Sequence, residues 1–91
     1  MKVRVYDISS ISHMMYHNGK PCDKYTATVK IGIVGKVGWA SGTWYLCVYA
    51  PTEHALEQKL DRFRTNEIVE IGAEHVDNLY NGGRKYGKTN N

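Results

Sequence analysis

The fold is decided by a stretch in the middle of the chain, Gly42-Thr43-Trp44-Tyr45-Leu46-Cys47-Val48-Tyr49-Ala50-Pro51-Thr52. Residues 43–49 are rich in aromatic and β-branched side chains, which predicts a strand. Pro51 cannot continue a strand ladder and Thr52 is a good N-cap, so a helix is predicted to begin directly afterwards. This strand and helix together form the unit against which the other elements must pack.

The predicted helix covers residues 53–64 and has one apolar stripe. Its apolar positions follow the i, i+4, i+7 spacing of a single helix face: Leu56, Leu60 and Phe63. Asn66 is predicted to end the helix in a left-handed conformation. A further strand is predicted over Glu67 to Val76, with three residues alternating inward: Val69, Ile71 and Ala73.

Two more strands are predicted ahead of the central unit. The clearer one covers residues 24–34, where apolar residues alternate with Thr26, Thr28 and Lys30. Its apolar face consists of Tyr25, Ala27, Val29, Ile31 and Ile33. The other covers residues 2–8, with Val3 and Val5 on one face and with Arg4 and Tyr6 on the opposite face. Such alternation indicates a sheet with one buried and one solvated face.

The connecting segments complete a single small domain. Residues 9–23 are predicted to form a loop or partly extended arm with an Asn18-Gly19 turn, and residues 78–83 to form another turn before a short return strand at Arg84. A mostly antiparallel sheet of this size can hide its edges by closing into a β-barrel that the helix plugs. We therefore predict a mainly β domain over residues 1–86 and a flexible basic tail over 87–91.

Composition narrows the class of protein. The chain has 91 residues, of which 42% are hydrophobic and 23% charged, as in ordinary globular domains. We expect no membrane span, because no apolar run approaches about 18 residues. The alternating start Lys2-Val3-Arg4-Val5 lacks an apolar signal core, so a cytoplasmic protein is expected, and Cys22 and Cys47 are expected to be reduced thiols.

Charge is distributed unevenly along the chain. Residues 1–51 carry a net charge of +4, residues 52–79 carry −4, and residues 80–91 carry +3. A polyanion would therefore meet the sheet and the tail rather than the helix. Ordinary solvated charge is the alternative explanation.

The order of elements and several local motifs resemble the single-stranded-DNA-binding protein family of bacteria and phages, which has an OB-fold. The similar motifs are the opening Met1-Lys2-Val3-Arg4-Val5, the turn and strand Tyr16-His17-Asn18-Gly19-Lys20 and Tyr25-Thr26-Ala27-Thr28-Val29, Thr43-Trp44 with the following helix, and Asn66-Glu67-Ile68-Val69-Glu70-Ile71-Gly72. The resemblance implies sequence-independent binding of single-stranded DNA, or RNA, in phage or mobile-element replication or recombination, by a homo-oligomer (dimer or tetramer) in the host cytoplasm.

Three features depart from that family. Trp44 and Tyr49 are five residues apart, which places them on opposite faces of a regular strand, whereas the family's stacking aromatics share a face. The chain stops where the family's fifth strand would run, so that strand would be replaced by a partner chain or by a very short strand from Arg84, or the sheet would stay open. The acidic C-terminal tip through which the family recruits enzymes is missing, so recruitment is not implied.

Single-strand binding needs aromatic platforms that stack on bases and cations that contact phosphates. The predicted platforms are Trp39, Trp44, Tyr6 and Tyr49, and the predicted phosphate contacts are Arg4, Lys30, Lys36, Arg84 and Lys85. Trp44 and Lys30 are the foremost candidates, because pattern and resemblance agree there. Trp39 stands in a glycine-rich loop, where it either meets a partner or folds back onto the core. Tyr25, Tyr45 and Phe63 are predicted to be core residues.

Other chemistries have weaker support. His13 and His17 have the i, i+4 spacing of two ligands on one helix face, but the acidic residue of a metalloprotease motif is missing and no cysteine cluster stands nearby, so no metal or other cofactor is expected. Cys47 lies within an apolar strand and is predicted to be inert, and no catalytic motif indicates an enzyme. The alternative function is a small phage-encoded interaction module that uses the same sheet to inhibit a host enzyme or defence protein.

Overall fold

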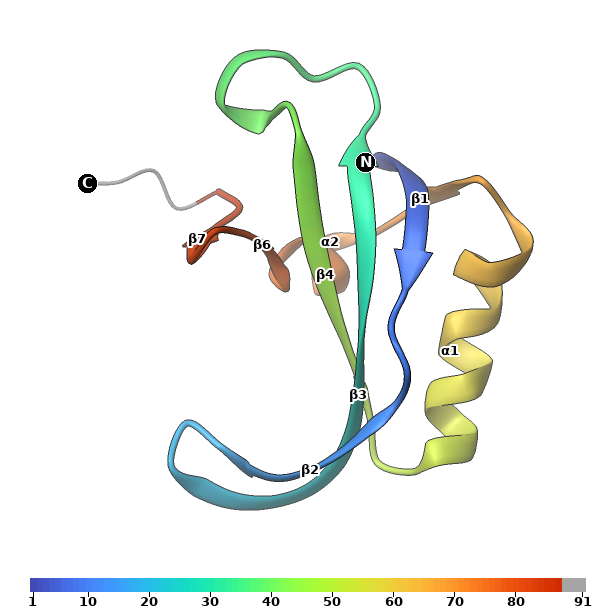
Figure 1. The fold of residues 1–91 in the computed structure, drawn as a ribbon, viewed down its shortest axis with the longest axis vertical. Helices are drawn as coiled ribbons and strands as arrows, with labels where there is room; N and C mark the ends of the chain where they lie inside the picture. Colours follow the sequence, from blue (N-terminus) through green and yellow to red (C-terminus); the bar gives the residue numbers. More distant parts are fainter. Residues whose placement is uncertain (88–91) are drawn as a thin grey trace.

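Helix α1 packs against one face of an antiparallel sheet (Figure 1). The computed structural model describes residues 1–87, apart from the Trp39 side chain. Its strands are β1 (Lys2–Ile8), β2 (Ser12–His17), β3 (Lys20–Ile33), β4 (Thr43–Ala50), β5 (Ile68–Glu70), β6 (Leu79–Asn81) and β7 (Arg84–Lys85). Its helices are α1 (Glu53–Thr65), the single turn α2 (Ala73–Val76) and the 3-10 turn η1 (Gly38–Ala40).

The strands follow the order β5-β1-β3-β4-β6-β7, and β2 pairs with β3 outside this path. The mainly β fold with one long helix is thus confirmed, and the arrangement is consistent with an OB-like barrel. Strands β5 and β7 stand at opposite ends of the path and do not pair with each other, so the sheet is not closed. Within residues 1–87 no helix has both the length and the hydrophobicity needed to cross a membrane.

The core lies between α1 and the inner face of the sheet. Leu56, Leu60 and Phe63 of α1 are buried, as their spacing predicts. They pack in one cluster with the inward residues of the two longest strands: Ala27, Val29, Ile31, Ile33, Trp44, Leu46, Val48 and Ala50. Burial of each large apolar side chain contributes about 1.5–3 kcal/mol, so this interface supplies most of the driving force for folding.

Of the two predicted ends of α1, the structure confirms the N-terminal cap and not the conformation of the C-terminal residue. The Thr52 hydroxyl accepts a hydrogen bond from the Ala55 N–H at 3.1 Å, which confirms the predicted N-cap. The prediction of a left-handed Asn66 is wrong, because its φ is −132°. The chain leads from there into β5, which pairs with β1 and requires extended backbone.

The predicted strand over residues 67–76 is also partly wrong. Strand β5 ends at Glu70, and the Ile71 N–H donates the next hydrogen bond to the Met1 carbonyl. Val69 and Ile71 are buried as predicted, but Ala73 is exposed because it begins α2 after Gly72. The chain turns back at this point to bring β6 alongside β4.

The segment predicted as a loop or extended arm forms a hairpin of β2 and the first part of β3 (Figure 1). Asn18 and Gly19 have φ values of 54° and 78° and make the tight turn that their sequence predicts. Strand β3 therefore starts at Lys20, four residues earlier than the alternation suggested, and continues without a break from the hairpin into the core.

The C-terminal part contains one strand that the sequence did not reveal. The predicted turn over residues 78–83 is interrupted by β6: Asn78 belongs to the turn before this strand, and Gly82-Gly83, with φ values of 57° and 85°, makes the turn after it. The short return strand predicted at Arg84 is confirmed as β7. Residues 88–91 of the predicted tail lie outside the described residues.

Candidate nucleic-acid interface

Trp44 is not on the surface that we predicted for it. Its side chain is fully buried, its Nε1–H donates to the Ala40 carbonyl at 3.1 Å, and its ring contacts Tyr86 edge-on at 5.2 Å. Strand alternation places it on the same side as Leu46 and Val48, against α1. A base cannot stack on this indole, so the prediction of Trp44 as a binding platform is wrong.

The β3–β4 loop holds two other predicted residues. Lys36 is exposed in this loop, at the top of Figure 1. The backbone of Trp39 belongs to η1, but its side chain is outside the described part, so its role stays a prediction.

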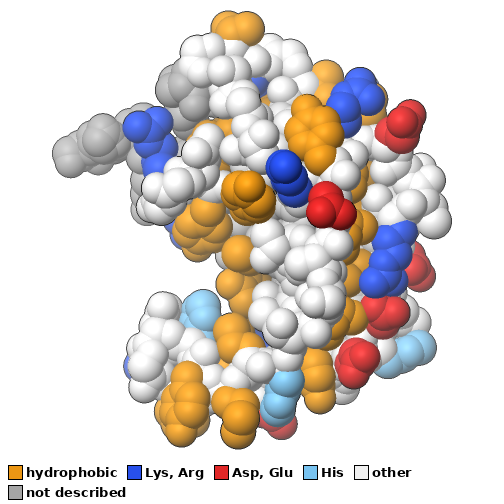
Figure 2. Space-filling model, in the orientation of Figure 1, with side chains coloured by type: hydrophobic (Ala, Val, Ile, Leu, Met, Phe, Trp, Pro, Cys, Tyr) orange, Lys and Arg blue, Asp and Glu red, His pale blue; other side chains and the backbone are white. Residues whose placement is uncertain are grey.

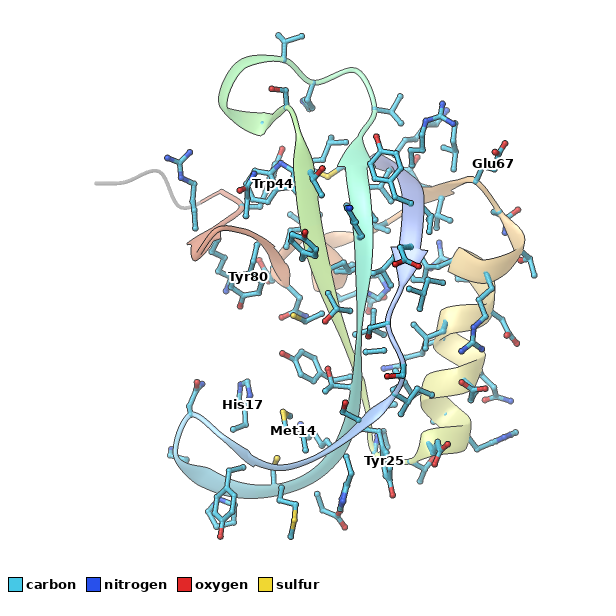
Figure 3. All side chains as sticks on the ribbon, in the orientation of Figure 1. Met14, His17, Tyr25, Trp44, Glu67 and Tyr80 are labelled. Atoms are coloured by element: carbon cyan, nitrogen blue, oxygen red, sulfur yellow. The ribbon has the colours of Figure 1, made fainter. Side chains whose placement is uncertain are left out.

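The outer face of the sheet carries a row of tyrosines and lysines in direct register. Lys30 of β3 pairs with Tyr45 of β4, Tyr45 pairs with Tyr80 of β6, and Tyr80 pairs with Lys85 of β7. Directly opposed side chains on neighbouring strands lie on the same face, about 4.5–5.5 Å apart at Cβ. We call these four residues the Lys-Tyr row; Figure 3 labels Tyr80 within it.

Tyr45 was predicted to be a core residue, and this is wrong. Its side chain is 43% exposed, because it alternates with the buried Trp44 and Leu46. Tyr25, in contrast, is half-buried against the core, and Phe63 is a core residue as predicted. The period-two pattern of β4 contained the information needed to place Tyr45 outside, since only one of two neighbouring aromatics can face α1.

Tyr6 and Arg4 extend the outer face along β1. A register shift between Val5 and Asp7 marks a β-bulge at Tyr6, and the Tyr6 ring lies over Gly32 of β3. A Cβ atom added at Gly32 would lie 2.5 Å from the Tyr6 hydroxyl, so the absence of a side chain makes room for the ring. Arg4 is exposed and pairs with the same glycine.

The outer face also carries acidic side chains along β1, where Glu70 of β5 pairs with Lys2. Asp7 pairs with Lys30 and is exposed there, and it accepts a local hydrogen bond from the Ile8 N–H at 2.9 Å. In Figure 2 most of the visible Asp and Glu side chains lie on the α1 side, while hydrophobic and Lys or Arg side chains share the middle of the outer face with an acidic side chain. This distribution agrees with the charge asymmetry expected from the sequence.

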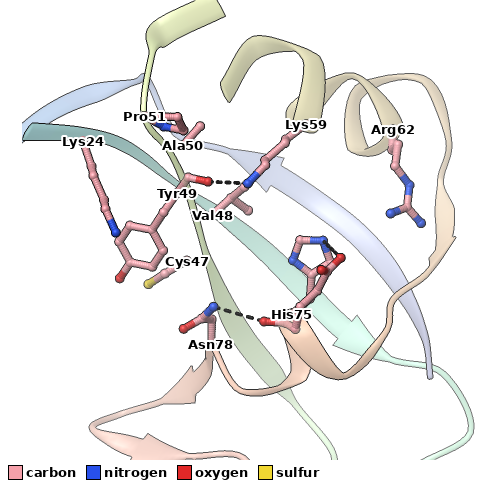
Figure 4. A pocket seen from close by; sticks show the side chains of 11 residues that line it. Lys24, Cys47, Val48, Tyr49, Ala50, Pro51, Lys59, Arg62, His75 and Asn78 are labelled. Carbon is pink, nitrogen blue, oxygen red and sulfur yellow. Dashed lines mark hydrogen bonds and ion pairs between the residues drawn. The ribbon is translucent and has the colours of Figure 1, made fainter. Parts of the chain in front are cut away.

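Below the Lys-Tyr row the surface is hollowed between the hairpin and the β6–β7 segment (Figure 2). A cleft of about 400 Å³ lies here, which we call the hairpin cleft. It is lined by Met14, His17, Lys20, Pro21, Cys22, Lys24, Tyr49 and Asn78. A second cavity of about 450 Å³ shares Lys24, Tyr49 and Asn78 and extends toward Lys59 and His75 (Figure 4).

Tyr49 lies between these two cavities. Its burial, followed by the neighbouring Cys47 and Tyr80, raises the pKa of its phenol to about 12, so the side chain is neutral at physiological pH. Lys59 of α1 donates a hydrogen bond to the Tyr49 carbonyl at 2.8 Å (Figure 4). Cys47 was predicted to be enclosed in the core, and this is wrong. It is half-buried beside Tyr49 on the outer side of β4, because it shares the outward parity of residues 45 and 49.

The structure thus brings together some predicted residues and separates others. Arg4, Tyr6, Lys30 and Lys85 share the outer face, exposed Arg84 lies at its β7 edge, and Tyr49 lines the adjoining cleft. Sequence reasoning missed Tyr80 altogether, because β6 is only three residues long and has no recognisable period.

The histidine pair considered as a metal site has a different geometry. His13 and His17 belong to a strand, not a helix. His13 contacts Asp23 and stacks on Tyr25 at 4.7 Å, whereas His17 meets Tyr49 edge-on at 5.9 Å. Within residues 1–87, no group of three or more His, Cys, Asp or Glu side chains is arranged to hold a metal ion.

Comparison with known proteins does not extend this picture. No protein-family model, no curated protein and no solved structure matches this chain. The resemblance to single-stranded-DNA-binding proteins therefore stays a prediction from the motifs quoted above.

Proposed function

We propose that this protein binds single-stranded nucleic acid, DNA in the first place, without sequence preference, on the outer face of its sheet. The observation that carries the proposal is the Lys-Tyr row, in which two phenol rings stand between two cations in direct register. The motif resemblance adds the expectation that the protein acts as a homo-oligomer in phage or mobile-element replication or recombination.

The chemistry of the row fits this ligand. Tyr45 is 43% exposed and Tyr6 is 56% exposed, so both offer ring surface to bases. Stacking of a base on an aromatic side chain contributes about 1–3 kcal/mol and tolerates any base. Neighbouring strands are about 4.8 Å apart, so the row from β3 to β7 spans about 14 Å, with Lys30 and Lys85 at its two ends as phosphate contacts.

The test is a titration of fluorescently labelled oligo-dT, followed by anisotropy at several salt concentrations. Tyr45→Ala and Tyr80→Ala are each expected to weaken binding about 5-fold to 150-fold, the equivalent of one lost stacking contact. Lys30→Ala is expected to lower the slope of log affinity against log salt by about 0.7, because one phosphate contact is lost.

Matched controls come from surfaces away from the row. Tyr16 is 66% exposed on the hairpin, and Arg64 lies on α1, where it pairs with Glu57 at 2.8 Å. Tyr16→Ala and Arg64→Ala should bind oligo-dT like the parent protein. Absence of binding at low salt, or equal losses in the control and row variants, would contradict the proposal.

One observation favours the alternative, a protein-interaction module. Met15 and Tyr16 are 62% and 66% exposed side by side on the hairpin, and such side chains are enriched where proteins meet. This function predicts capture of a protein partner that survives nuclease treatment and is lost in a Met15→Ser, Tyr16→Ala variant. The two functions are distinguishable, since Tyr16→Ala affects only the second.

A further inference from the structure

The hairpin contains a β-bulge that changes which side chains face the cleft. Met14 pairs with Lys24, but Tyr16 pairs with Pro21, so the register shifts between Met14 and Tyr16. In a regular strand residues 14 and 17 would face opposite sides. Because of the shift, Met14 and His17 both line the hairpin cleft, while Met15 and Tyr16 are 62% and 66% exposed.

Three side chains that can bind a transition metal line this cleft: the thioether of Met14, the imidazole of His17 and the thiol of Cys22. The Cys22 Sγ donates a hydrogen bond to the Met14 carbonyl at 3.3 Å, so the thiol lies beside Met14 in the wall of the cleft. Figure 3 shows Met14 and His17 pointing into the same hollow. Met14 and Cys22 are half-buried and His17 is exposed, so an ion can enter past the imidazole.

We propose that Met14, His17 and Cys22 form a binding site for a soft monovalent metal ion, of which Cu(I) is the biological example. Thiolate and thioether ligands select Cu(I), and imidazole also suits copper. The eight residues that line the cleft include no carboxylate. Hard cations such as Mg²⁺ or Ca²⁺, which require oxygen ligands, therefore find no charged partner in it.

The charges around the cleft favour a monovalent ion over Zn²⁺. Lys20 and Lys24 line the same cleft. A Cu(I)–thiolate unit is neutral and is not repelled by these ammonium groups, whereas Zn²⁺ with the single thiolate retains a positive charge next to them. Binding replaces the thiol proton of Cys22, which passes to solvent, so affinity for Cu(I) should rise with pH. No electron is transferred, because the ion enters and stays as Cu(I).

The experiment is an anaerobic titration of the full chain with Cu(I), kept reduced by ascorbate, in competition with the coloured chelator bicinchoninate. We expect one tightly bound Cu(I) per chain. Cys22→Ser and Met14→Leu should each weaken binding by about tenfold or more, in line with the sensitivity of metal sites to changes in their immediate surroundings. Far-UV circular dichroism verifies that each variant is folded.

Cys47→Ser is the matched control, because it removes the other half-buried thiol, which lies beside Tyr49 outside this cluster. It should bind Cu(I) like the parent protein. X-ray absorption of the loaded protein should show sulfur and nitrogen ligands, with the sulfur contribution reduced in both Cys22→Ser and Met14→Leu. No competition by the parent protein, or equal losses in Cys22→Ser and Cys47→Ser, would overturn the assignment.

Discussion

Substitution of Trp44 separates a structural from a binding role for this indole. Aromatic side chains bury about 150–250 Å² each, and truncation of a buried Trp to Ala typically costs about 3–5 kcal/mol. Trp44 is fully buried, so Trp44→Ala is expected to lose about 4 kcal/mol of unfolding free energy. A domain of this length has a total of roughly 5–14 kcal/mol, so Trp44→Ala would be marginal.

Trp44→Phe is the more informative variant. Phenylalanine retains much of the apolar contact but cannot donate the hydrogen bond that Nε1 makes to the buried Ala40 carbonyl at 3.1 Å. An unsatisfied buried acceptor costs about 1–3 kcal/mol, so we expect a loss of about 2 kcal/mol. With a urea m-value of about 1–3 kcal/mol/M, the unfolding midpoint should fall by about 0.7–2 M at unchanged m.

The assay combines urea unfolding, followed by far-UV circular dichroism, with oligo-dT anisotropy on the folded protein. Trp44→Phe should be less stable and bind oligo-dT like the parent, whereas Tyr45→Ala should bind weakly with little change in stability. A Trp44→Phe protein that is as stable as the parent but binds oligo-dT poorly would show that the indole acts at the surface, and the assignment of the two β4 faces would be wrong.

Three further predictions concern single contacts. Thr52→Ala should lower the unfolding free energy by about 1 kcal/mol in urea melts, because the N-cap bond to Ala55 N–H is lost, and Thr52→Ser should restore it. Gly32→Ala should displace the Tyr6 ring, since the new methyl would lie 2.5 Å from its hydroxyl; we expect about fivefold weaker oligo-dT binding, measured by anisotropy, and a stability change below about 1 kcal/mol. Burial raises the pKa of the Tyr49 phenol to about 12, against 10.0 in the unfolded chain, so the unfolded state loses the phenol proton at lower pH than the folded state. The contribution of the protonated phenol to stability is therefore complete below pH 10.0 and is lost as the pH rises toward 12. Between about pH 9 and about pH 11, the urea midpoint should therefore fall less in Tyr49→Phe than in the parent protein. An identical fall in the two proteins would contradict the burial of this phenol.

The long elements of the fold could be predicted because their patterns repeat. Strand β3 alternates over its whole core segment, and α1 carries a complete apolar stripe with an N-cap. Strands β5 and β6, each three residues long, contain too little pattern to fix their ends. Their positions depend on hydrogen bonds to β1 and β4, which are distant in the sequence.

The candidate site was predicted less well than the fold. Arg4, Tyr6 and Lys30 were placed correctly on the outer face, because they alternate with apolar neighbours. Trp44 was assigned to the wrong face because the stacking chemistry of an indole was given more weight than its parity with Leu46. The convergence of Met14 and His17 in one cleft depends on a β-bulge, and a bulge leaves no trace in the alternation of a short polar strand.

The unbroken course of β3 from the hairpin into the core has a mechanical consequence. Its 14 residues pair with β2 near one end and with β1 and β4 near the other. The hairpin therefore has no hinge in β3, and a force applied at the tip of the hairpin must be transmitted as torsion along that strand. A ligand that draws the tip of the hairpin toward the β6–β7 segment would twist the β3–β4 pairing that places Lys30 opposite Tyr45. Amide hydrogen exchange would then change along the whole length of β3.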